Sequence, residues 1–300
     1  MTGSRRILLS VVVATLTFKT QACLTRSGPK VVDDLKISDS PGPESPKVTS
    51  LKLTQGHAPY SANGKPQKVS WFMCQIASPA GAVILAHDEA AGFDSATFCD
   101  LPESQAFLAA GFHVAGFNRP GFGASTGERD LVGKQSQQAA LVAAKETLRA
   151  NSGLNSAIVG AYGFGTGAAA ASFFSKQSGN LQWLITGGGI YDFEQAARTS
   201  SDGGLTSMIK KTTDREGEVA YETRSIAYDV NGLPPRIAIF QGADDTVAPA
   251  DQANSFRDSL AASQFKVTFQ EIKGINHQIN PSQIRQILDV MIASAKKPKS

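Results

Sequence analysis

The sequence has little excess charge of either sign: 29 Lys and Arg against 26 Asp and Glu give a formal net charge of +3. Three of the basic residues, Arg5, Arg6 and Lys19, lie in a segment that we expect to be removed, which leaves the rest near neutrality. The sequence therefore shows no basic footprint for nucleic acid, and we expect no nucleic-acid partner. It also contains no internal repeat, and its ordinary apolar fraction of 41% allows one sizeable core.

The N-terminal segment lacks an apolar run of membrane-spanning length but has the features of a signal peptide. Its two arginines precede an apolar stretch, residues 7–18, that is too short to span a bilayer comfortably. Thr20-Gln21-Ala22 then offers small residues before Cys23, so the segment resembles that of a bacterial lipoprotein. We predict a signal peptide over residues 1–22 and export to the bacterial cell envelope, the periplasm or the outside. Lipidation of Cys23, which would attach the protein to a membrane, and plain secretion with an unmodified Cys23 both stay open, because such proteins usually carry leucine where Thr20 stands.

Cysteine is scarce in the rest of the chain, which has only Cys74 and Cys99. The two residues can pair in an oxidising compartment, and a loop of that length would gain about 3–4 kcal/mol from the cross-link. Two buried free thiols are the alternative, because the sequence does not give the distance between them. Residues 23–47 are rich in Pro, Ser and Gly and cannot form a core, so we expect a flexible tether there.

From residue 48 to residue 300 we predict one domain, because strand and helix patterns alternate. Such alternation predicts an α/β fold with a mostly parallel sheet and helices on both faces. Strands are expected at 48–53 and 68–76, as a hairpin around Asn63-Gly64, and at 81–86, 112–117, 157–162, 181–186, 236–241 and 266–272. Helices are expected at 101–110, 134–150, 168–174, 249–262 and 281–295. Residues 191–232 break the alternation, and they are interpreted either as a small cap or as an ordinary surface excursion.

The segment Gly163-Phe164-Gly165-Thr166-Gly167 lacks a serine where one is expected. A strand, Gly-x-Ser-x-Gly and a helix together form the nucleophile elbow of α/β-hydrolases, and here Gly165 takes the place of the serine. No alkoxide can therefore form at this position. Thr166 does not simply substitute, because its side chain would leave the turn in another direction and its backbone N–H is the expected oxyanion donor.

Four further segments resemble motifs of the α/β-hydrolase superfamily and occur in the order of that superfamily. Ala86-His87-Asp88-Glu89 stands at the oxyanion loop, residues 118–127 match the pattern D/N-x-x-G-x-G-x-S-x-G, residues 242–249 match the turn with the triad acid, and Gly274-Ile275-Asn276-His277 matches the histidine loop. The resemblance covers roughly residues 68–295, and its C-terminal part looks most like the prolyl-oligopeptidase and dienelactone-hydrolase branch. It implies the α/β-hydrolase fold, with the active groups outside the carboxyl ends of the strands.

The same resemblance assigns roles to two side chains. His277 would accept a proton from the nucleophile, and Asp245 would orient the imidazole ring and stabilise its charged form. Asp244 competes with Asp245, but the spacing in the superfamily favours Asp245 and leaves Asp244 as a turn residue. His57 and His113 have no such context, and we expect both to be structural.

Two departures from the superfamily decide the chemistry. Asp88 stands where the superfamily usually has glycine after His87, and a carboxylate beside a developing oxyanion is repulsive unless it is neutralised. A turn role for Asp88 is the alternative. At the elbow, a residue other than glycine adopts a sparsely allowed conformation that costs about 1–3 kcal/mol, whereas glycine adopts it freely. We therefore predict that Gly165→Ser lowers the thermal stability.

Three functions fit these observations. The leading hypothesis is an exported pseudo-hydrolase that keeps the fold, the pair Asp245–His277 and a pocket, and binds a small molecule, a peptide or an envelope protein. The second is a working hydrolase of the ester or peptide class that uses another nucleophile, Ser125 or Thr166 being the nearest, or water activated by His277. The third is a metal site formed by His87, Asp88, Glu89 and His277; we predict neither a metal nor a cofactor.

Overall fold

A computed structural model of the protein describes residues 37, 48, 51–152 and 157–296. The predicted signal peptide, Cys23 and nearly all of the tether lie outside the described residues. In the part that is described, no helix combines the length and the apolar character needed to cross a membrane.

Within the described residues, eight strands form one sheet in the order β1-β2-β4-β3-β5-β6-β7-β8. Strands β1 and β2 form an antiparallel hairpin, β2 is also antiparallel to β4, and all other neighbours are parallel. The bounds are β1 Lys52–Ala62, β2 Lys65–Gln75, β3 Ala82–Ala86, β4 His113–Phe117, β5 Ile158–Phe164, β6 Trp183–Gly187, β7 Arg236–Gly242 and β8 Lys266–Ile272. Every residue of β3, β4 and β6 is buried, as expected for strands that are covered on both faces.

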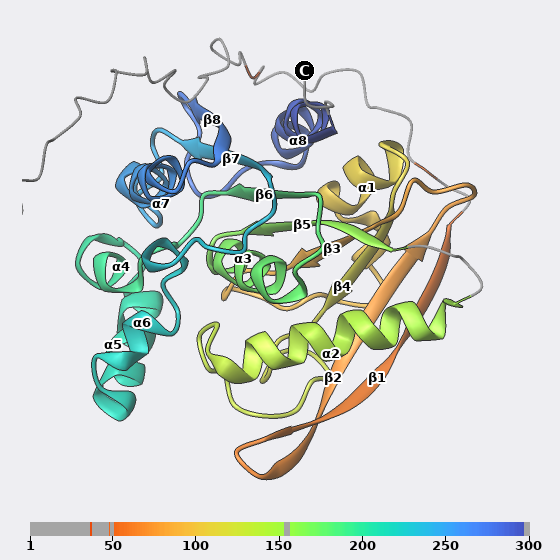
Figure 1. Ribbon diagram of the computed structural model, residues 1–300, viewed down its shortest axis with the longest axis horizontal. Helices are drawn as coiled ribbons and strands as arrows, with labels where there is room; N and C mark the ends of the chain where they lie inside the picture. Colours follow the sequence, from red (N-terminus) through yellow and green to blue (C-terminus); the bar gives the residue numbers. More distant parts are fainter. Residues whose placement is uncertain (1–36, 38–47, 49–50, 153–156, 297–300) are drawn as a thin grey trace, which may run out of the picture.

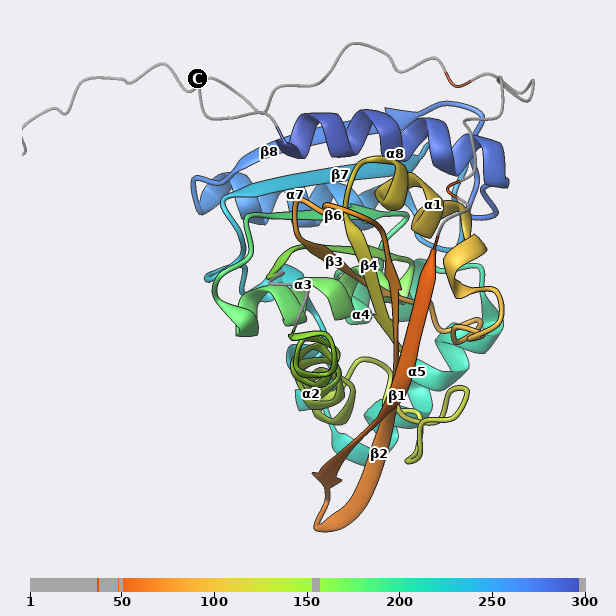
Figure 2. The ribbon, with the colours of Figure 1, turned by 90° about the vertical axis from the view of Figure 1, so that its right-hand side faces the viewer.

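Helices cover both faces of the sheet. Helices α1 Pro102–Ala109 and α8 Pro281–Lys296 lie on one side, and α2 Lys134–Ala150 and α3 Thr166–Ser178 lie on the other (Figures 1 and 2). Helix α7 Ala250–Ala262 belongs to the same hydrophobic cluster as α2 and α3. Each face has its own core: Leu184 of β6 packs with the α2, α3 and α7 side, whereas Trp183 and Ile185 pack with the α1 and α8 side. This alternation follows from the two-residue period of a strand.

The predicted elements match the observed ones closely, with two differences. Strand β1 begins at Lys52 rather than at residue 48 and continues to Ala62, where Asn63 and Gly64 form the turn with φ angles of 52° and 71°. The adjacent polar residues Thr54 and Gln55, together with Gly56 and Pro59, interrupt the alternation that would mark this half-exposed edge strand in the sequence. Helix α3 is also longer than predicted, because it begins at Thr166 directly after the elbow and ends only at Gly179, whose φ of 70° caps it.

Cys74 on β2 and Cys99 in the short helix η1 Phe98–Asp100 are joined by a disulfide, with their Cα atoms 5.7 Å apart. The bond fastens η1 to the sheet beside Phe72 and Phe98, whose ring centroids lie 5.4 Å apart. Of the two alternatives that the sequence leaves open, the structure therefore contains the cross-link.

We expect the Cys74→Ala/Cys99→Ala variant to lose about 3 kcal/mol of unfolding free energy, because the chain between the two cysteines regains its freedom in the unfolded state. The sequence separation that enters this value is 25 residues. Urea unfolding of the natural and the variant chains measures the loss, and reductant added to the natural chain should reproduce it. Equal stability of the oxidised natural chain and the variant would contradict the bond.

Residues 191–232 form an insertion between β6 and β7. It contains α4 Phe193–Thr199, α5 Gly203–Glu216, α6 Val219–Glu222 and the short helix η3 Ile226–Tyr228. Helices α4, α5 and α6 gather at one edge of the molecule, at the lower left of Figure 1.

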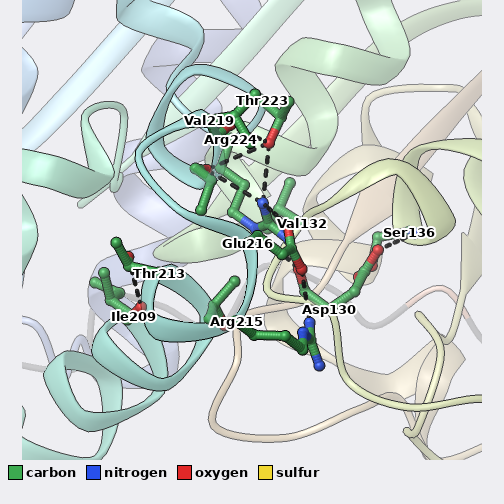
Figure 3. A network of polar contacts seen from close by, with 12 residues as sticks. Asp130, Val132, Ser136, Ile209, Thr213, Arg215, Glu216, Val219, Thr223 and Arg224 are labelled. Atoms are coloured by element: carbon green, nitrogen blue, oxygen red, sulfur yellow. Dashed lines mark hydrogen bonds and ion pairs between the residues drawn. The ribbon is translucent and has the colours of Figure 1, made fainter.

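A buried arginine fastens the insertion to the rest of the fold (Figure 3). Arg224 is only 3% exposed; its Nε donates to the carbonyl oxygen of Asp130 at 3.1 Å, and its guanidinium pairs with the Glu216 carboxylate at 2.9 Å. The Asp130 carboxylate in turn accepts from the backbone N–H of Ser136, in the first turn of α2, at 2.9 Å. The end of α5 and the loop before α2 are thus held by one polar network.

Candidate active site

The candidate residues follow the carboxyl ends of the parallel strands. Asp88 comes after β3, Gly165 after β5, Asp245 after β7 and His277 after β8. The structure brings these residues together, since they line or support one cleft. This is the edge of the sheet at which parallel α/β folds place their ligands.

The elbow keeps its geometry although its serine is absent. Gly165 has φ 59° and ψ −128° and is the N-cap residue of α3. A φ of this value strains any residue with a Cβ atom, but it costs glycine nothing. The turn also brings Gly167 close to β3, so that a Cβ atom on Gly167 would lie 2.3 Å from the carbonyl oxygen of Ala86. The backbone is therefore that of a sharp strand-to-helix turn.

Asp245 and His277 are in direct contact. The Nδ1 atom of His277 lies 2.8 Å from Oδ2 of Asp245, and the other carboxylate oxygen accepts from the backbone N–H groups of Val247 and Ala248 at 2.9 and 2.8 Å. Asp245 is buried, whereas Asp244 is exposed and takes part in the turn through its backbone N–H. The arrangement fixes the orientation of the His277 ring, whose Nε2 atom lies 3.7 Å from Oδ2 of Asp88 at the cleft.

Asp88 fills the space that a nucleophile side chain would occupy. A Cβ atom built on Gly165 would lie 2.3 Å from Oδ1 of Asp88, closer than any non-bonded contact allows. The same oxygen accepts from the backbone N–H of Thr166 at 2.7 Å and from its hydroxyl at 2.9 Å. The Asp88 carboxylate therefore lies where the missing serine side chain would be. It also accepts the hydrogen bond of the expected oxyanion donor, the backbone N–H of Thr166.

The charges of Asp88 and His277 support each other. The Oδ2 atom of Asp88 lies 3.7 Å from Nε2 of His277. Burial disfavours the His277 cation, but Asp245 and Asp88 outweigh this effect and raise its pKa to about 9. Burial likewise disfavours the Asp88 anion, but His277 and the backbone N–H of Thr166 lower its pKa to about 2. With a pKa of about 9, the His277 imidazole is mostly protonated at neutral pH, which weakens it as a base.

We expect the unfolding free energy to fall as the pH rises from 6.5 to 9, because His277 has an ordinary pKa of 6.5 when unfolded and about 9 when folded. A raised pKa contributes stability that is complete below the unfolded value and lost above the folded one. The loss amounts to about 3 kcal/mol. Urea unfolding across this range, for the natural chain and for His277→Gln, measures it. Parallel pH profiles of the two chains would show that His277 is not the group responsible.

His87, which the sequence predicts for the oxyanion or binding group, does not line the cleft. Its side chain is buried, its Nδ1 lies 2.7 Å from the carbonyl oxygen of Asp88, and its Nε2 accepts from the backbone N–H of Arg119 at 3.0 Å. Burial and the nearby guanidinium of Arg119 lower its pKa to about 3, so the ring is neutral. Both ring nitrogens are engaged with backbone, and the four-residue metal site that includes His87 does not assemble. Among the described residues, no group of three His, Cys, Asp or Glu side chains is placed to hold a metal ion.

The alternative nucleophiles are not placed for attack. Ser125 is buried away from the cleft; its hydroxyl donates to the carbonyl oxygen of Asn118 at 2.6 Å and accepts from the backbone N–H of Ser70 at 2.9 Å. The Thr166 hydroxyl donates to Asp88. His113 is buried with its Nδ1 accepting from a backbone N–H, and His57 is exposed on β1, so neither belongs to the site.

The cleft in front of Asp88 has a volume of about 240 Å³ and is lined by both charged and apolar side chains. Its charged groups are Asp88, Glu89, Arg129, Asp202 and His277, and its apolar side chains are Ile190, Leu205, Met208 and Val247. Because Leu205 and Met208 belong to α5, the insertion forms one side of the cleft.

Arg119 supports the cleft from inside, a role that the sequence does not reveal. It is 1% exposed, and its guanidinium pairs with Glu89 at 2.9 Å and donates to the Thr166 hydroxyl and to the carbonyl oxygen of His87, each at 3.2 Å. Arg119 lies in the Asn118-Arg119-Pro120-Gly121 part of a motif identified in the sequence. Because arginine is rarely buried, the sequence does not predict its burial or its ion pair with Glu89.

The sequence and the structure were compared with those of known proteins. No protein-family model matches the sequence, and no curated protein matches it. Solved structures do match. The acylaminoacyl peptidase of Pyrococcus horikoshii has a TM-score of 0.65 at 15% identity, over 83% of this chain and 43% of that one. A puromycin-hydrolysing peptidase of Mycobacterium tuberculosis has a TM-score of 0.67 at 20% identity, over 84% and 40%.

A smaller protein matches over nearly its whole length. An esterase of Pyrococcus furiosus has a TM-score of 0.61 at 16% identity, over 89% of this chain and 98% of that one. The chain thus spans less than half of the two peptidases but nearly all of the esterase. At these identities the likeness shows the fold alone: the chain has the α/β-hydrolase fold, as its sequence motifs predict.

Proposed function

We propose that this chain is an exported pseudo-hydrolase that binds a small molecule or a peptide in its cleft and does not hydrolyse esters or peptides through an acyl-serine. One observation carries the proposal: the carboxylate of Asp88 lies where the serine side chain and the oxyanion would have to be. A bound acyl substrate would therefore meet no attacking hydroxyl at position 165 and no free backbone N–H on Thr166. Removal of a triad nucleophile alone lowers turnover by about 10⁶-fold.

The electrostatics support the same proposal. Water could replace a serine only if His277 accepted its proton, and the imidazole is already protonated below a pKa of about 9. The cleft itself is intact, with apolar side chains from α5 and from the strand ends. Peptidases and esterases share the fold, so peptides and small esters are the ligand classes to test first.

Labelling with a fluorophosphonate tests the loss of acyl-transfer chemistry. We expect no covalent adduct on the natural chain at pH 7, because this probe reports on an activated serine. An adduct that disappears in both the Asp245→Ala and the His277→Ala variants would overturn the proposal, since it would reveal a nucleophile served by this pair.

Binding is tested by thermal shift with a panel of short peptides and short-chain esters, since a ligand of the folded state raises the melting temperature. The variant Met208→Lys, which places a charge in the cleft, should abolish any shift. Val219→Lys is the matched control, because Val219 is 51% exposed and lies outside the cleft. A shift that survives Met208→Lys would place the ligand elsewhere.

Export rests on the N-terminal segment alone. We propose cleavage after Ala22 and test it by mass spectrometry of the mature N-terminus in a bacterial host. A diacylglyceryl group on Cys23 would mean membrane attachment, an unmodified Cys23 would mean plain secretion, and an uncleaved leader would contradict export by this route.

A further inference from the structure

Three carboxylates line the cleft, and two of them have charged partners inside the fold. Asp88 accepts two hydrogen bonds from Thr166 and lies 3.7 Å from Nε2 of His277. Glu89 lies 2.9 Å from a guanidinium nitrogen of Arg119, and both side chains are buried. Neither carboxylate therefore depends on a ligand for its counterion.

The third carboxylate, Asp202, caps helix α5. Its Oδ1 atom accepts from the backbone N–H groups of Gly204 and Leu205 at 2.8 and 3.0 Å, so its charge lies at the positive end of the helix. The chain itself thus fills the N-terminus of α5, which leaves no anion site there. All three carboxylates of the cleft have partners without a ligand.

Arg129 is the charged residue of the cleft that has no counterion. Its side chain is exposed and lines the cleft, and its guanidinium lies over the ring of Phe122, 4.1 Å from the ring centroid. Within the described residues, none of the ion pairs includes Arg129. Because an aromatic ring contacts the face of a guanidinium, the N–H donors at its edge stay available to a ligand.

The backbone around Arg129 sets the position of its side chain. Gly121 has a φ of 77° and lies so close that a Cβ atom there would be 2.9 Å from both Cγ and N of Arg129. The next residue, Asp130, is held by Arg224 and Ser136 in the network of Figure 3. Since this part of the chain is already ordered, a ligand contact to Arg129 costs little conformational entropy.

We propose that the cleft binds a small monocarboxylate with an apolar tail and that Arg129 holds the carboxylate. The planar fork of a guanidinium matches a carboxylate with two parallel N–H···O hydrogen bonds. One unmatched cation is complemented by one negative charge, whereas a phosphate dianion would bring two charges close to three carboxylates. The tail lies against the apolar side chains of the cleft, which are Ile190, Leu205, Met208 and Val247.

This inference rests on the proposed function, in which the cleft binds a small molecule or a peptide, and it names the chemical class of the ligand. Peptides belong to this class through their C-terminal carboxylate. Neutral esters do not, because they offer Arg129 no charge. Arg129 therefore favours a free acid or the last residues of a peptide over an ester of the same size.

Isothermal titration calorimetry of the full chain with hexanoate, hexanamide and hexylammonium tests the proposal at pH 7. We expect hexanoate to bind at least about tenfold more tightly than hexanamide, because hydrogen bonds between charged groups are the stronger ones. Raising the salt concentration to about 0.5 M should weaken the binding of hexanoate alone, since salt screens the charges. The variant Arg129→Gln should lower the affinity for hexanoate about tenfold and change that for hexanamide by less than about twofold.

Arg257→Gln is the matched control. Arg257 also lies over a phenylalanine ring, 5.0 Å from the centroid of Phe269, but it does not line the cleft, so its replacement should leave both affinities unchanged. Thermal unfolding shows that each variant is folded.

Three results would overturn the inference: hexanamide or hexylammonium binding as tightly as hexanoate, an equal loss of hexanoate affinity in the Arg129→Gln and Arg257→Gln chains, or no binding of hexanoate. Each of them concerns the charge of the ligand. The thermal-shift panel of peptides and esters tests the proposed binding function separately, so a failure of this inference is distinguishable from a failure of that function.

Discussion

The Asp88→Gly/Gly165→Ser double variant should hydrolyse short-chain nitrophenyl esters at least about 10³-fold faster than the natural chain. The change supplies a hydroxyl at the elbow, frees the backbone N–H of Thr166 for the oxyanion and removes one of the two carboxylates beside His277. With Asp88 gone, the pKa of His277 falls, and the imidazole can accept the proton of the serine. Initial rates at pH 7 and 8 measure the gain.

The single Gly165→Ser variant should stay inactive and should unfold at a lower temperature than the natural chain. Its Cβ atom would lie 2.3 Å from Oδ1 and 2.4 Å from Cγ of Asp88, and the φ of 59° strains any residue other than glycine. The sequence predicts the stability loss from strain alone; the contact with Asp88 adds to it. Esterase activity of the single variant equal to that of the double variant would mean that Asp88 does not block the site. His277→Ala in the double variant should remove the gained activity.

Replacing Arg119 by methionine should lower the unfolding free energy by about 3–5 kcal/mol, because Glu89 would remain buried without its cation. Arg119 is 1% exposed and Glu89 is 8% exposed, and their charged groups are 2.9 Å apart. The substitution also removes the guanidinium that donates to the Thr166 hydroxyl and the His87 carbonyl oxygen. Urea unfolding at pH 7 measures the loss.

A double-mutant cycle makes this second prediction specific. Glu89→Leu removes the other charge, and removing both charges of a buried pair costs far less than removing one. The Arg119→Met/Glu89→Leu chain should therefore be more stable than Arg119→Met alone. A loss below about 1 kcal/mol in the single variant, or no recovery in the double variant, would contradict the role of the pair.

The strand and helix patterns predict the α/β fold, and the resemblance of residues 242–249 and 274–277 to superfamily motifs implies the pair Asp245–His277. Buried parallel strands are continuous apolar runs, and residues that follow their carboxyl ends meet at one edge of the sheet. The exposed strand β1 is only half recognised, because an edge strand with polar residues resembles a loop. The long helix α3 is underestimated because its Gly- and Ala-rich beginning is also an elbow.

What the sequence does not predict is the contact between Asp88 and Gly165. The two departures from the superfamily can be seen separately in the sequence, but Asp88 and Thr166 are 78 residues apart, and their hydrogen bond depends on the direction in which one side chain points. The same holds for Arg119, whose burial follows from the packing of three loops. One signal could have linked Asp88 and Gly165. They follow neighbouring strands, and one departure adds a carboxylate where the other removes a Cβ atom.

The contact between Asp88 and Gly165 also makes substitutions at the two positions depend on each other. A side chain at 165 and the present position of the Asp88 carboxylate exclude each other by distance. Introducing serine alone would create a clash, and removing the aspartate alone would leave the Thr166 N–H without its carboxylate acceptor and His277 without one of its two counterions. A random single substitution therefore samples only these two impaired sites, and mutagenesis libraries aimed at a serine-dependent activity have to vary positions 88 and 165 together.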